Sequence, residues 1–303
     1  MNATDRQHLL AEQNFLRAQL ARLPATARLT RMGAEARMRS IDSDLALLPT
    51  NGRQPARARL TFNGAPVVGS HGIFSDFGMR AVSSFTDAVA SIAASLTAPL
   101  ASMGPIPNRE QNQLLITNTA IGSFGFELEE FRGPQLPSED ESSVSIALDR
   151  TQALLQGTLG SDEDLADIAS ETDPRALEKV RAFLRVLAES DAVCAFQYCG
   201  QGVRFTDVGQ VRSSIERLGA DNLRESEQQF QGEFLGVLPN SRTFEFKLAG
   251  EEKIIRAKVA PSIQNVDELN QHLHQPTSIS VMATQVGNGR PRYLLTQMPN
   301  WPR

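Results

Sequence analysis

The stretch QQFQGEFLGVLPNSRTFEFKLAGEEKIIRAKVA, residues 228–260, decides the fold of the C-terminal quarter of the chain. From Thr243 to Leu248 apolar and polar residues alternate strictly, and the alternation returns from Lys253 to Val259 after a short turn. A period of two is typical of a half-buried β-strand. The two segments therefore predict a β-hairpin with one face in a core and one face in solvent.

Three further strands and a helix complete this region. We expect a less regular first strand at Phe230–Val237, a short helix at Val266–Leu273, and two last strands at Ile279–Ala283 and Arg292–Met298. Three strands, one helix and two strands is the element order of an OB-type barrel, so residues 228–303 are predicted to form a small OB-like β-barrel. Such barrels commonly hold single-stranded nucleic acid, oligosaccharide or a partner peptide.

Cations on the outer side of this barrel define a candidate surface for a polyanion. In an OB fold the ligand surface lies on the second and third strands and on two of the loops. The residues expected there are Arg242, Lys247, Arg256, Lys258, Arg290, Arg292 and Tyr293. Single-strand binders usually present several stacking rings, and only Tyr293 is expected to be exposed. The surface therefore favours a protein partner over nucleic acid, and both stay open.

The first 49 residues predict two helices separated by Pro24 and ended by Pro49. Their apolar residues recur at spacings of three, four and seven, which makes a narrow stripe on each helix. Two such helices form either a helical hairpin or a short coiled coil with a second copy. The predicted partner interface comprises Leu9, Leu16, Leu20, Met38, Ile41 and Leu45. Simple packing against the chain's own core explains the same stripe.

Residues 56–220 predict an α+β region. Alternation at Arg57–Phe62, followed by Asn63-Gly64, indicates a hairpin whose second strand is Ala65–Ile73. Two further strand pairs and five helices follow. Hairpins that alternate with helices favour an antiparallel sheet covered by helices over a doubly wound parallel sheet. The predicted fold class is α+β throughout, with helical hairpin, sheet-plus-helices region and barrel in that order.

Composition and charge limit the class of protein. The chain has 303 residues, 41% of them hydrophobic, and no apolar run long enough for a membrane span. We expect a cytoplasmic protein. The net charge is +5 over residues 1–60, −12 over 61–228 and +2 over 229–303. General coating of nucleic acid is therefore not expected, because phosphate binding needs clustered positive charge.

Catalytic motifs are sparse. The sequence has no Walker A loop, dinucleotide fingerprint, nucleophile elbow or zincin helix. Glu127 and Glu129 share one face of a predicted strand and could hold a divalent ion, although solvent-facing positions explain them equally well. Ser70, His71 and Asp76 have the residue types of a nucleophilic site, but adjacent strand residues face opposite ways. We expect no cofactor and no metal.

The sequence thus predicts a non-catalytic assembly protein. Its N-terminal helices would oligomerise or dock a protein partner, and its barrel would make a second contact. The alternative is a nucleic-acid-binding component of a multi-protein system that uses the basic face of the barrel. A hydrolase or a metal-dependent enzyme is a more distant alternative.

Overall fold

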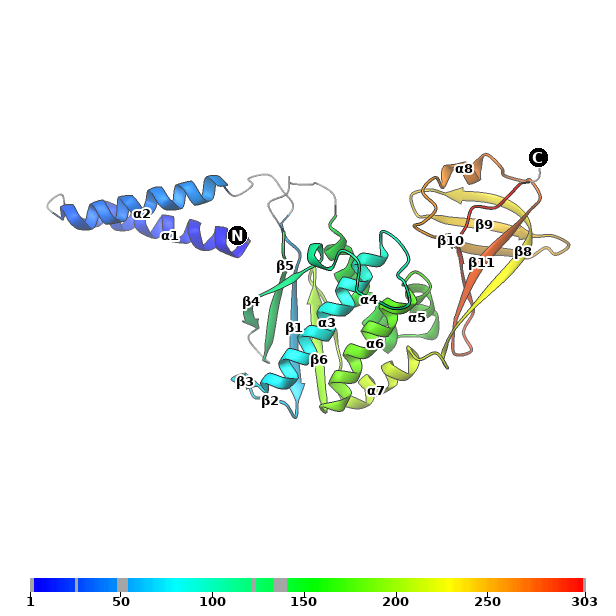
Figure 1. Ribbon diagram of the computed structural model, residues 1–303, viewed down its shortest axis with the longest axis horizontal. Helices are drawn as coiled ribbons and strands as arrows, with labels where there is room; N and C mark the ends of the chain where they lie inside the picture. The colour runs from blue at the N-terminus through cyan, green and yellow to red at the C-terminus, as the bar shows by residue number, and fades with distance from the viewer. Residues whose placement is uncertain (1–2, 25–26, 48–53, 121–123, 133–140, 302–303) are drawn as a thin grey trace.

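The computed structural model describes residues 3–24, 27–47, 54–120, 124–132 and 141–301 (Figure 1). It has a mixed α+β architecture with an antiparallel sheet and a closed five-stranded barrel, as the sequence predicts. We call the two N-terminal helices the arm, residues 54–217 the middle region, and residues 223–301 the barrel. Figure 1 shows the arm and the barrel at opposite ends of the molecule, with the middle region between them.

The arm consists of α1 (Ala3–Arg22) and α2 (Arg28–Leu47), which pack on each other. Arg37 donates two hydrogen bonds to the Glu12 carboxylate, at 2.8 and 2.9 Å, and Arg31 donates to the carbonyls of Leu20 and Leu23 at the end of α1. These contacts join the two helices at their middles and join the end of α1 to the start of α2. The cluster between the helices comprises Leu9, Leu16, Ala34 and Ile41, which are buried, and Leu20, Met38 and Leu45, which are half-buried.

The middle region is built on a five-stranded antiparallel sheet. The strand order is β4 (Leu114–Ala120), β5 (Gly125–Glu130), β1 (Arg57–Gly64), β6 (Ala192–Tyr198) and β7 (Gln201–Arg204). In β1 the alternate residues Ala58, Leu60 and Phe62 are buried, which confirms the predicted period of two. That buried face supplies the floor of the main core.

Helices cover this face of the sheet (Figure 1). They are α3 (Ser75–Ser95), α4 (Ser143–Leu159), α5 (Asp162–Ala169), α6 (Pro174–Glu189) and α7 (Val208–Arg217), with a short 3-10 helix η1 (Arg109–Gln111) after α3. Phe85 of α3 packs its ring 5.4 Å from that of Phe183 on α6 and 5.1 Å from that of Phe196 on β6. The helices and the sheet therefore share one continuous hydrophobic core.

The predicted hairpin between β1 and residues 65–73 is wrong. β1 pairs with β5 on one edge and β6 on the other, so neither edge is left for a following strand. Residues 65–73 instead form a small ladder of β2 (Val67–Val68) and β3 (Gly72–Ile73). Gly64 has a φ of +116°, and a Cβ there would lie 2.3 Å from the Asp191 carbonyl oxygen. The glycine serves close approach of two strands, not a hairpin turn.

The barrel contains β8 (Leu223–Leu238), β9 (Thr243–Leu248), β10 (Ile254–Val259), α8 (Asp267–Asn270), β11 (Thr277–Val286) and β12 (Arg292–Leu295). The strands close in the order β10-β12-β11-β8-β9, with β10 and β12 parallel and the other pairs antiparallel. Phe234, Phe244 and Phe246 fill the interior. The ring centroids of Phe244 and Phe246 lie 5.3 and 5.0 Å from the ring centroid of Phe234. The alternation in residues 243–259 thus produces a closed core.

The two ends of the barrel differ. At one end β8 and β11 extend as a paired ribbon, and Leu223 and Val286 at its tip pack into the core of the middle region. At the other end, the Trp301 ring stacks on the His272 ring after α8, with centroids 4.1 Å apart and planes 15° apart. The β8–β11 ribbon therefore packs the barrel against the middle region, whereas the stack at the other end joins only residues of the barrel.

Candidate binding groove

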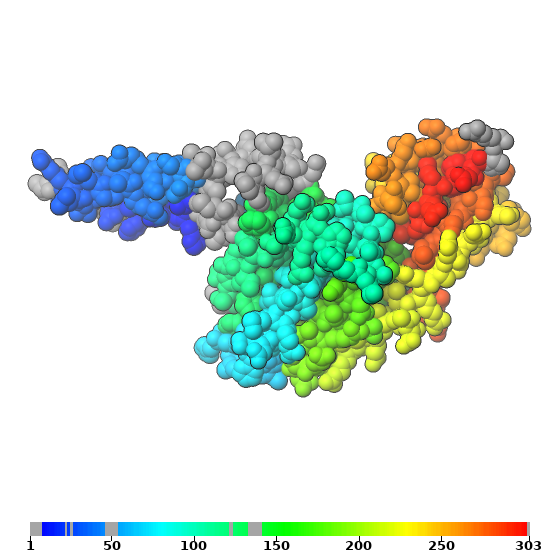
Figure 2. Space-filling model, in the orientation of Figure 1, coloured from blue at the N-terminus to red at the C-terminus, as the bar shows by residue number. Residues whose placement is uncertain are grey.

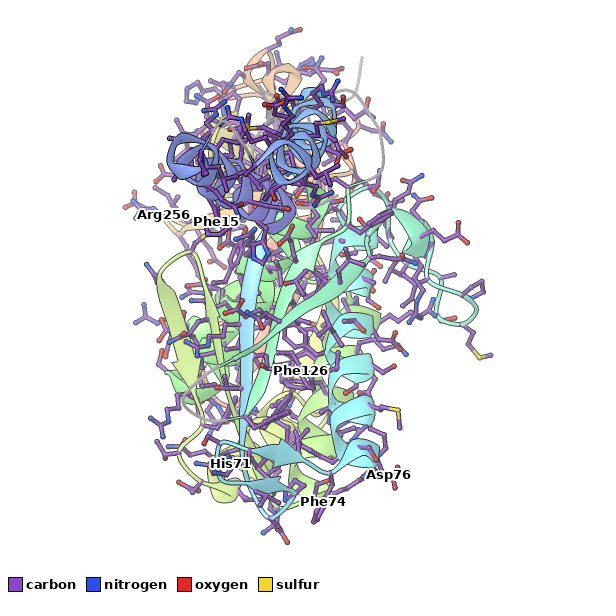
Figure 3. All side chains as sticks on the ribbon, turned by 90° about the vertical axis from the view of Figure 1, so that its left-hand side faces the viewer. Phe15, His71, Phe74, Asp76, Phe126 and Arg256 are labelled. Atoms are coloured by element: carbon purple, nitrogen blue, oxygen red, sulfur yellow. The ribbon has the colours of Figure 1, made fainter. Side chains whose placement is uncertain are left out.

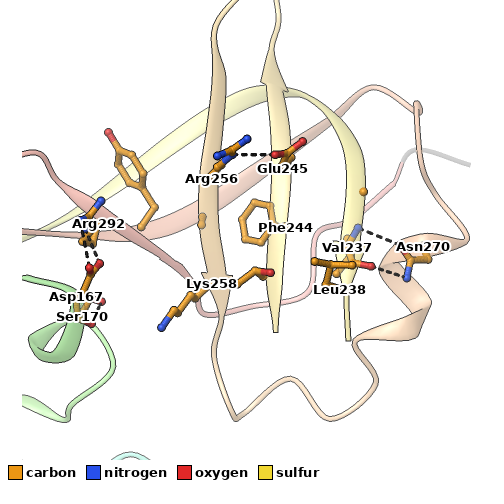
Figure 4. A pocket seen from close by; sticks show the side chains of 14 residues that line it. Asp167, Ser170, Val237, Leu238, Phe244, Glu245, Arg256, Lys258, Asn270 and Arg292 are labelled. Carbon is orange, nitrogen blue, oxygen red and sulfur yellow. Dashed lines mark hydrogen bonds and ion pairs between the residues drawn. The ribbon is translucent and has the colours of Figure 1, made fainter. Parts of the chain in front are cut away.

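A groove of about 690 Å³ lies between the outer surface of the barrel and α5 (Figure 4). Barrel strands form its floor, and Asp167 and Ser170 of the α5 segment stand at one end while Asn270 of α8 stands at the other. The barrel residues that line it are Gly236, Val237, Leu238, Thr243, Phe244, Glu245, Arg256, Ala257, Lys258, Arg292 and Tyr293. Its volume falls in the range of about 300–1,000 Å³ usual for ligand sites.

Strand alternation places charged side chains on the groove side. Phe244 and Ala257 are buried, so their neighbours Glu245, Arg256 and Lys258 project outward. Arg256 and Glu245 are cross-strand partners in the β9–β10 ladder. Their side chains form an ion pair with an Nε to Oε1 distance of 2.8 Å. The pairing of the two strands therefore also sets the pairing of their charges.

Two ion pairs join the groove's other cations to the middle region. Arg292 Nε lies 2.6 Å from Asp167 Oδ1, and its Nη2 donates to Asp167 Oδ2 at 3.2 Å. Lys258 pairs with Glu171, just beyond α5. All three cations of the groove lining therefore have a carboxylate partner. Their combined attraction for phosphate is reduced accordingly.

Apolar groups occupy the α8 end of the groove. Asn270 accepts a hydrogen bond from the Val237 amide at 3.2 Å and donates one to the Val237 carbonyl at 3.1 Å, which fixes β8 where its register shifts against β9. The next residue, Leu238, is left 65% exposed. At the other end the Tyr293 ring packs edge-on against Phe230 at 5.4 Å, and burial raises the pKa of the Tyr293 hydroxyl above its usual value.

The predicted polyanion residues divide into groups. Arg256, Lys258, Arg292 and Tyr293 come together in the groove. Arg242 instead donates from Nε to the Val259 carbonyl at 3.1 Å and from Nη2 to the Ile263 carbonyl at 2.6 Å, so it holds barrel loops together. Lys247 lines a second hollow of about 760 Å³, between β8, β9 and residues 276–278, and Arg290 is exposed in the β11–β12 turn.

The chain matches no known protein family or structure. Comparisons with protein-family models, with curated proteins and with solved structures find nothing similar to the chain. Within the described ranges, none of the helices combines the length and apolar character needed to cross a bilayer. The groove and the arm are therefore the features of the molecule that bear on its function.

The arm residues predicted as a partner interface all lie in the cluster between α1 and α2. Ile41 is 0% exposed, so this stripe is used within the chain. The outer surface of the arm carries other large apolar residues: Phe15, Leu29 and Met32 are 67%, 86% and 64% exposed. Phe15 lies on α1, and Leu29 and Met32 are the only two of these residues that share a face of α2, so no repeating stripe reveals them in the sequence.

The weaker chemical candidates are placed as follows. Glu129 is buried, with Oε2 at 3.0 Å from Arg57 Nε, whereas its neighbour Glu127 is exposed. His71 lies in the β2–β3 turn (Figure 3), and Cys199 is exposed in the turn after β6. In the described part of the chain, no three His, Cys, Asp or Glu side chains are arranged to hold a metal ion.

Asp167, Ser170, Leu238 and Asn270 are groove residues that sequence reasoning missed. The strongly acidic run Asp162-Glu163-Asp164 with Asp167 was visible as a signal, since a basic barrel face follows in the same chain. Nothing in the sequence showed which acids would meet which cations, because Asp167 and Arg292 are 125 residues apart.

Proposed function

We propose that this protein is a non-catalytic assembly factor that binds through its two ends. The arm self-associates or docks a protein partner, and the barrel makes a second contact through its groove. The proposal rests on one observation about the arm. It stands away from the rest of the molecule (Figure 2), and large apolar side chains remain exposed on its outer surface.

The charge of the arm supports a contact with an acidic surface. Residues 17–39, from the last part of α1 to the first part of α2, contain six arginines and one glutamate. Leu29 and Met32 are exposed on this part of α2. A basic surface that also presents apolar side chains is suited to an acidic protein surface with apolar positions, because steering and burial then act together. Residues 61–228 of a second copy carry a net charge of −12.

Light scattering tests this proposal. The full chain is compared with a Leu29→Asp/Met32→Asp variant and with a truncated chain that begins at Thr50. Leu29→Asp and Met32→Asp replace exposed residues, so the double variant should still fold. A Ser40→Asp/Ser43→Asp variant adds the same charge to exposed positions of the same helix and is the matched control. We expect the full chain and the serine control to have a mass above that of a monomer, and the other two to be monomeric. A monomer in every sample would remove self-association.

We further propose that the barrel is of the OB type. Its strands pair as first with second, second with third, third in parallel with fifth, fifth with fourth and fourth with first, with a short helix before the fourth. Ligands of such barrels commonly lie over the second and third strands. In this chain those strands are β9 and β10, which form the floor of the groove.

Binding of nucleic acid is a second candidate, because Arg256, Lys258, Arg292 and Tyr293 share the groove. The proposal predicts oligonucleotide binding that weakens steeply with salt and with Arg256→Ala/Lys258→Ala. Arg242 is an unsuitable position for a control substitution, because its guanidinium group holds the barrel loops together. Lys253→Ala, on an exposed cation outside the groove, serves instead. Absence of binding at low salt removes this candidate.

A further inference from the structure

We propose that the groove binds an extended segment of a protein partner that carries a carboxylate close to a large apolar side chain. This inference rests on the proposed assembly function and names the chemistry of the second contact. Three features of the groove support it. One is the position of the exposed apolar surface, the second is a cation whose ion pair is weak, and the third is a set of carboxylates that would repel a phosphate chain.

The apolar part of the ligand is set by the α8 end of the groove. Leu238 is 65% exposed beside Val237, and the two lie next to Phe244 in Figure 4. The Asn270 side chain holds the Val237 backbone, so this apolar surface is rigid before any ligand arrives. A leucine, isoleucine or phenylalanine of the partner would cover Leu238 and remove apolar surface from water.

The acidic part of the ligand is set by Arg256. Its side chain is 84% exposed and its partner Glu245 is 44% exposed, so their ion pair is formed in a strongly solvated place and is weak. Arg292 and Lys258, by contrast, are held by carboxylates of the middle region. Arg256 is therefore the groove cation best able to turn to a ligand, and a guanidinium binds a carboxylate with two parallel hydrogen bonds.

Carboxylates beside the groove disfavour a phosphate chain. Asp167 and Glu245 line it, and Glu171 lies next to it on Lys258. A phosphate backbone would bring several negative charges close to these three groups, whereas a peptide brings one carboxylate to one place. Stacking is also limited, because Phe244 is buried in the barrel core and Tyr293 packs on Phe230.

An extended segment suits the shape of the groove. The floor crosses β9 and β10, with a helical segment standing at each end (Figure 4). Both edges of β9 are paired, to β8 and β10, so a ligand above β9 meets side chains and not free backbone groups. Successive side chains of an extended peptide point to opposite sides, which lets alternate residues face Arg256 and Leu238.

A random dodecapeptide phage library, panned against the full-length protein, tests the inference. We expect enriched peptides to combine Asp or Glu with Leu, Ile or Phe a few residues away. Anisotropy of a labelled enriched peptide should show about tenfold weaker binding for Arg256→Glu and for Leu238→Asp, since each change removes one anchor. Matched controls are Lys253→Glu and Ile254→Asp, which alter exposed barrel residues that do not line the groove.

Several results would overturn the inference. These are no enrichment, enriched peptides without an acidic residue, or equal losses in the control variants. Tighter binding of oligothymidylate than of the enriched peptide, at the same salt concentration, would assign the groove to nucleic acid. A monomeric full chain that still selects such peptides removes self-association and leaves the groove inference standing. An oligomer that selects none removes the groove inference alone.

Discussion

The arm and the barrel occupy the two ends of the molecule and are stabilised in different ways. Among the described residues, the arm buries four apolar side chains between its helices, while the barrel core buries thirteen, three of them phenylalanines. Most of the stability of a helix in a protein comes from packing of its apolar face, so the stability of α1 and α2 depends on what their apolar surfaces contact. The barrel is closed around its own core. The arm therefore has the smaller core of the two ends, and it is the end where we propose an outside contact.

The largest effect is expected from Phe246→Ala in the barrel. Phe246 is fully buried, and its ring lies 5.0 Å from that of Phe234. Loss of this side chain should cost about 3–5 kcal/mol of unfolding free energy, through lost burial and the cavity left behind. Hydrogen exchange followed by mass spectrometry should show faster exchange in β8 to β12 and unchanged exchange in α1 and α2. Equal acceleration in the arm would contradict the independence of the two ends.

Ile41→Ala should have the next largest effect and should be confined to the arm. Ile41 is completely buried in a cluster of few members, so its loss removes about 2–3 kcal/mol from a small total. We expect lower helical circular dichroism and fast exchange in both α1 and α2, with barrel exchange unchanged. Ser43→Ala, an exposed change two residues away, is the control. Retained protection of the arm would mean that a larger contact already stabilises it.

Two glycines of β8 sharpen the description of the barrel. A Cβ at Gly232 would lie 1.9 Å from the Lys247 carbonyl oxygen, whereas a Cβ at Gly236 would meet nothing within 4 Å. Gly232→Ala should therefore cost about 1–3 kcal/mol, because β9 backbone must move. Gly236→Ala should change stability by less than about 0.5 kcal/mol. Urea unfolding of the two variants measures the difference, and equal midpoints would contradict the strand contact.

The smallest effect is expected where the barrel meets α5. Arg292→Asp breaks the ion pair with Asp167, which is partly exposed, so the loss should be about 1 kcal/mol or less. Adding Asp167→Arg to Arg292→Asp restores the pair with its charges exchanged. Exchange rates in β12 and α5 should rise in the single variant and recover in the double variant. Failure to recover would show that the pair does not hold the two regions together.

Local sequence patterns predicted most of the barrel. β9 begins and ends at the predicted residues, since its alternation reflects one buried and one solvated face. The first half of β8 was missed because Arg224 to Gln229 has no alternation: this part of the strand is exposed and is held by pairing with β11. The pairing partners of β1 were also missed, because sheet order depends on contacts between distant segments.

The groove was only partly visible for the same reason. Outward cations could be found from the strand period, and four of the seven chosen residues line the groove. Their carboxylate partners could not be found, since Asp167 and Glu171 reach the barrel through folding of the whole middle region. Arg242 was chosen for its charge, yet its guanidinium is taken up by backbone carbonyls whose positions no local pattern reveals.

The stack of Trp301 on His272 gives the molecule a useful optical property. Trp301 is the chain's sole tryptophan, and it sits at the barrel end remote from the middle region. Tryptophan emission of the intact protein therefore reports on the barrel and is blind to the arm. Helical circular dichroism reports on α1 and α2 together with the helices of the middle region. If the ends are independent, its unfolding curve should contain an arm transition that the emission curve lacks. The loss on Ile41→Ala of a transition seen by circular dichroism, with emission unchanged, would assign that transition to the arm.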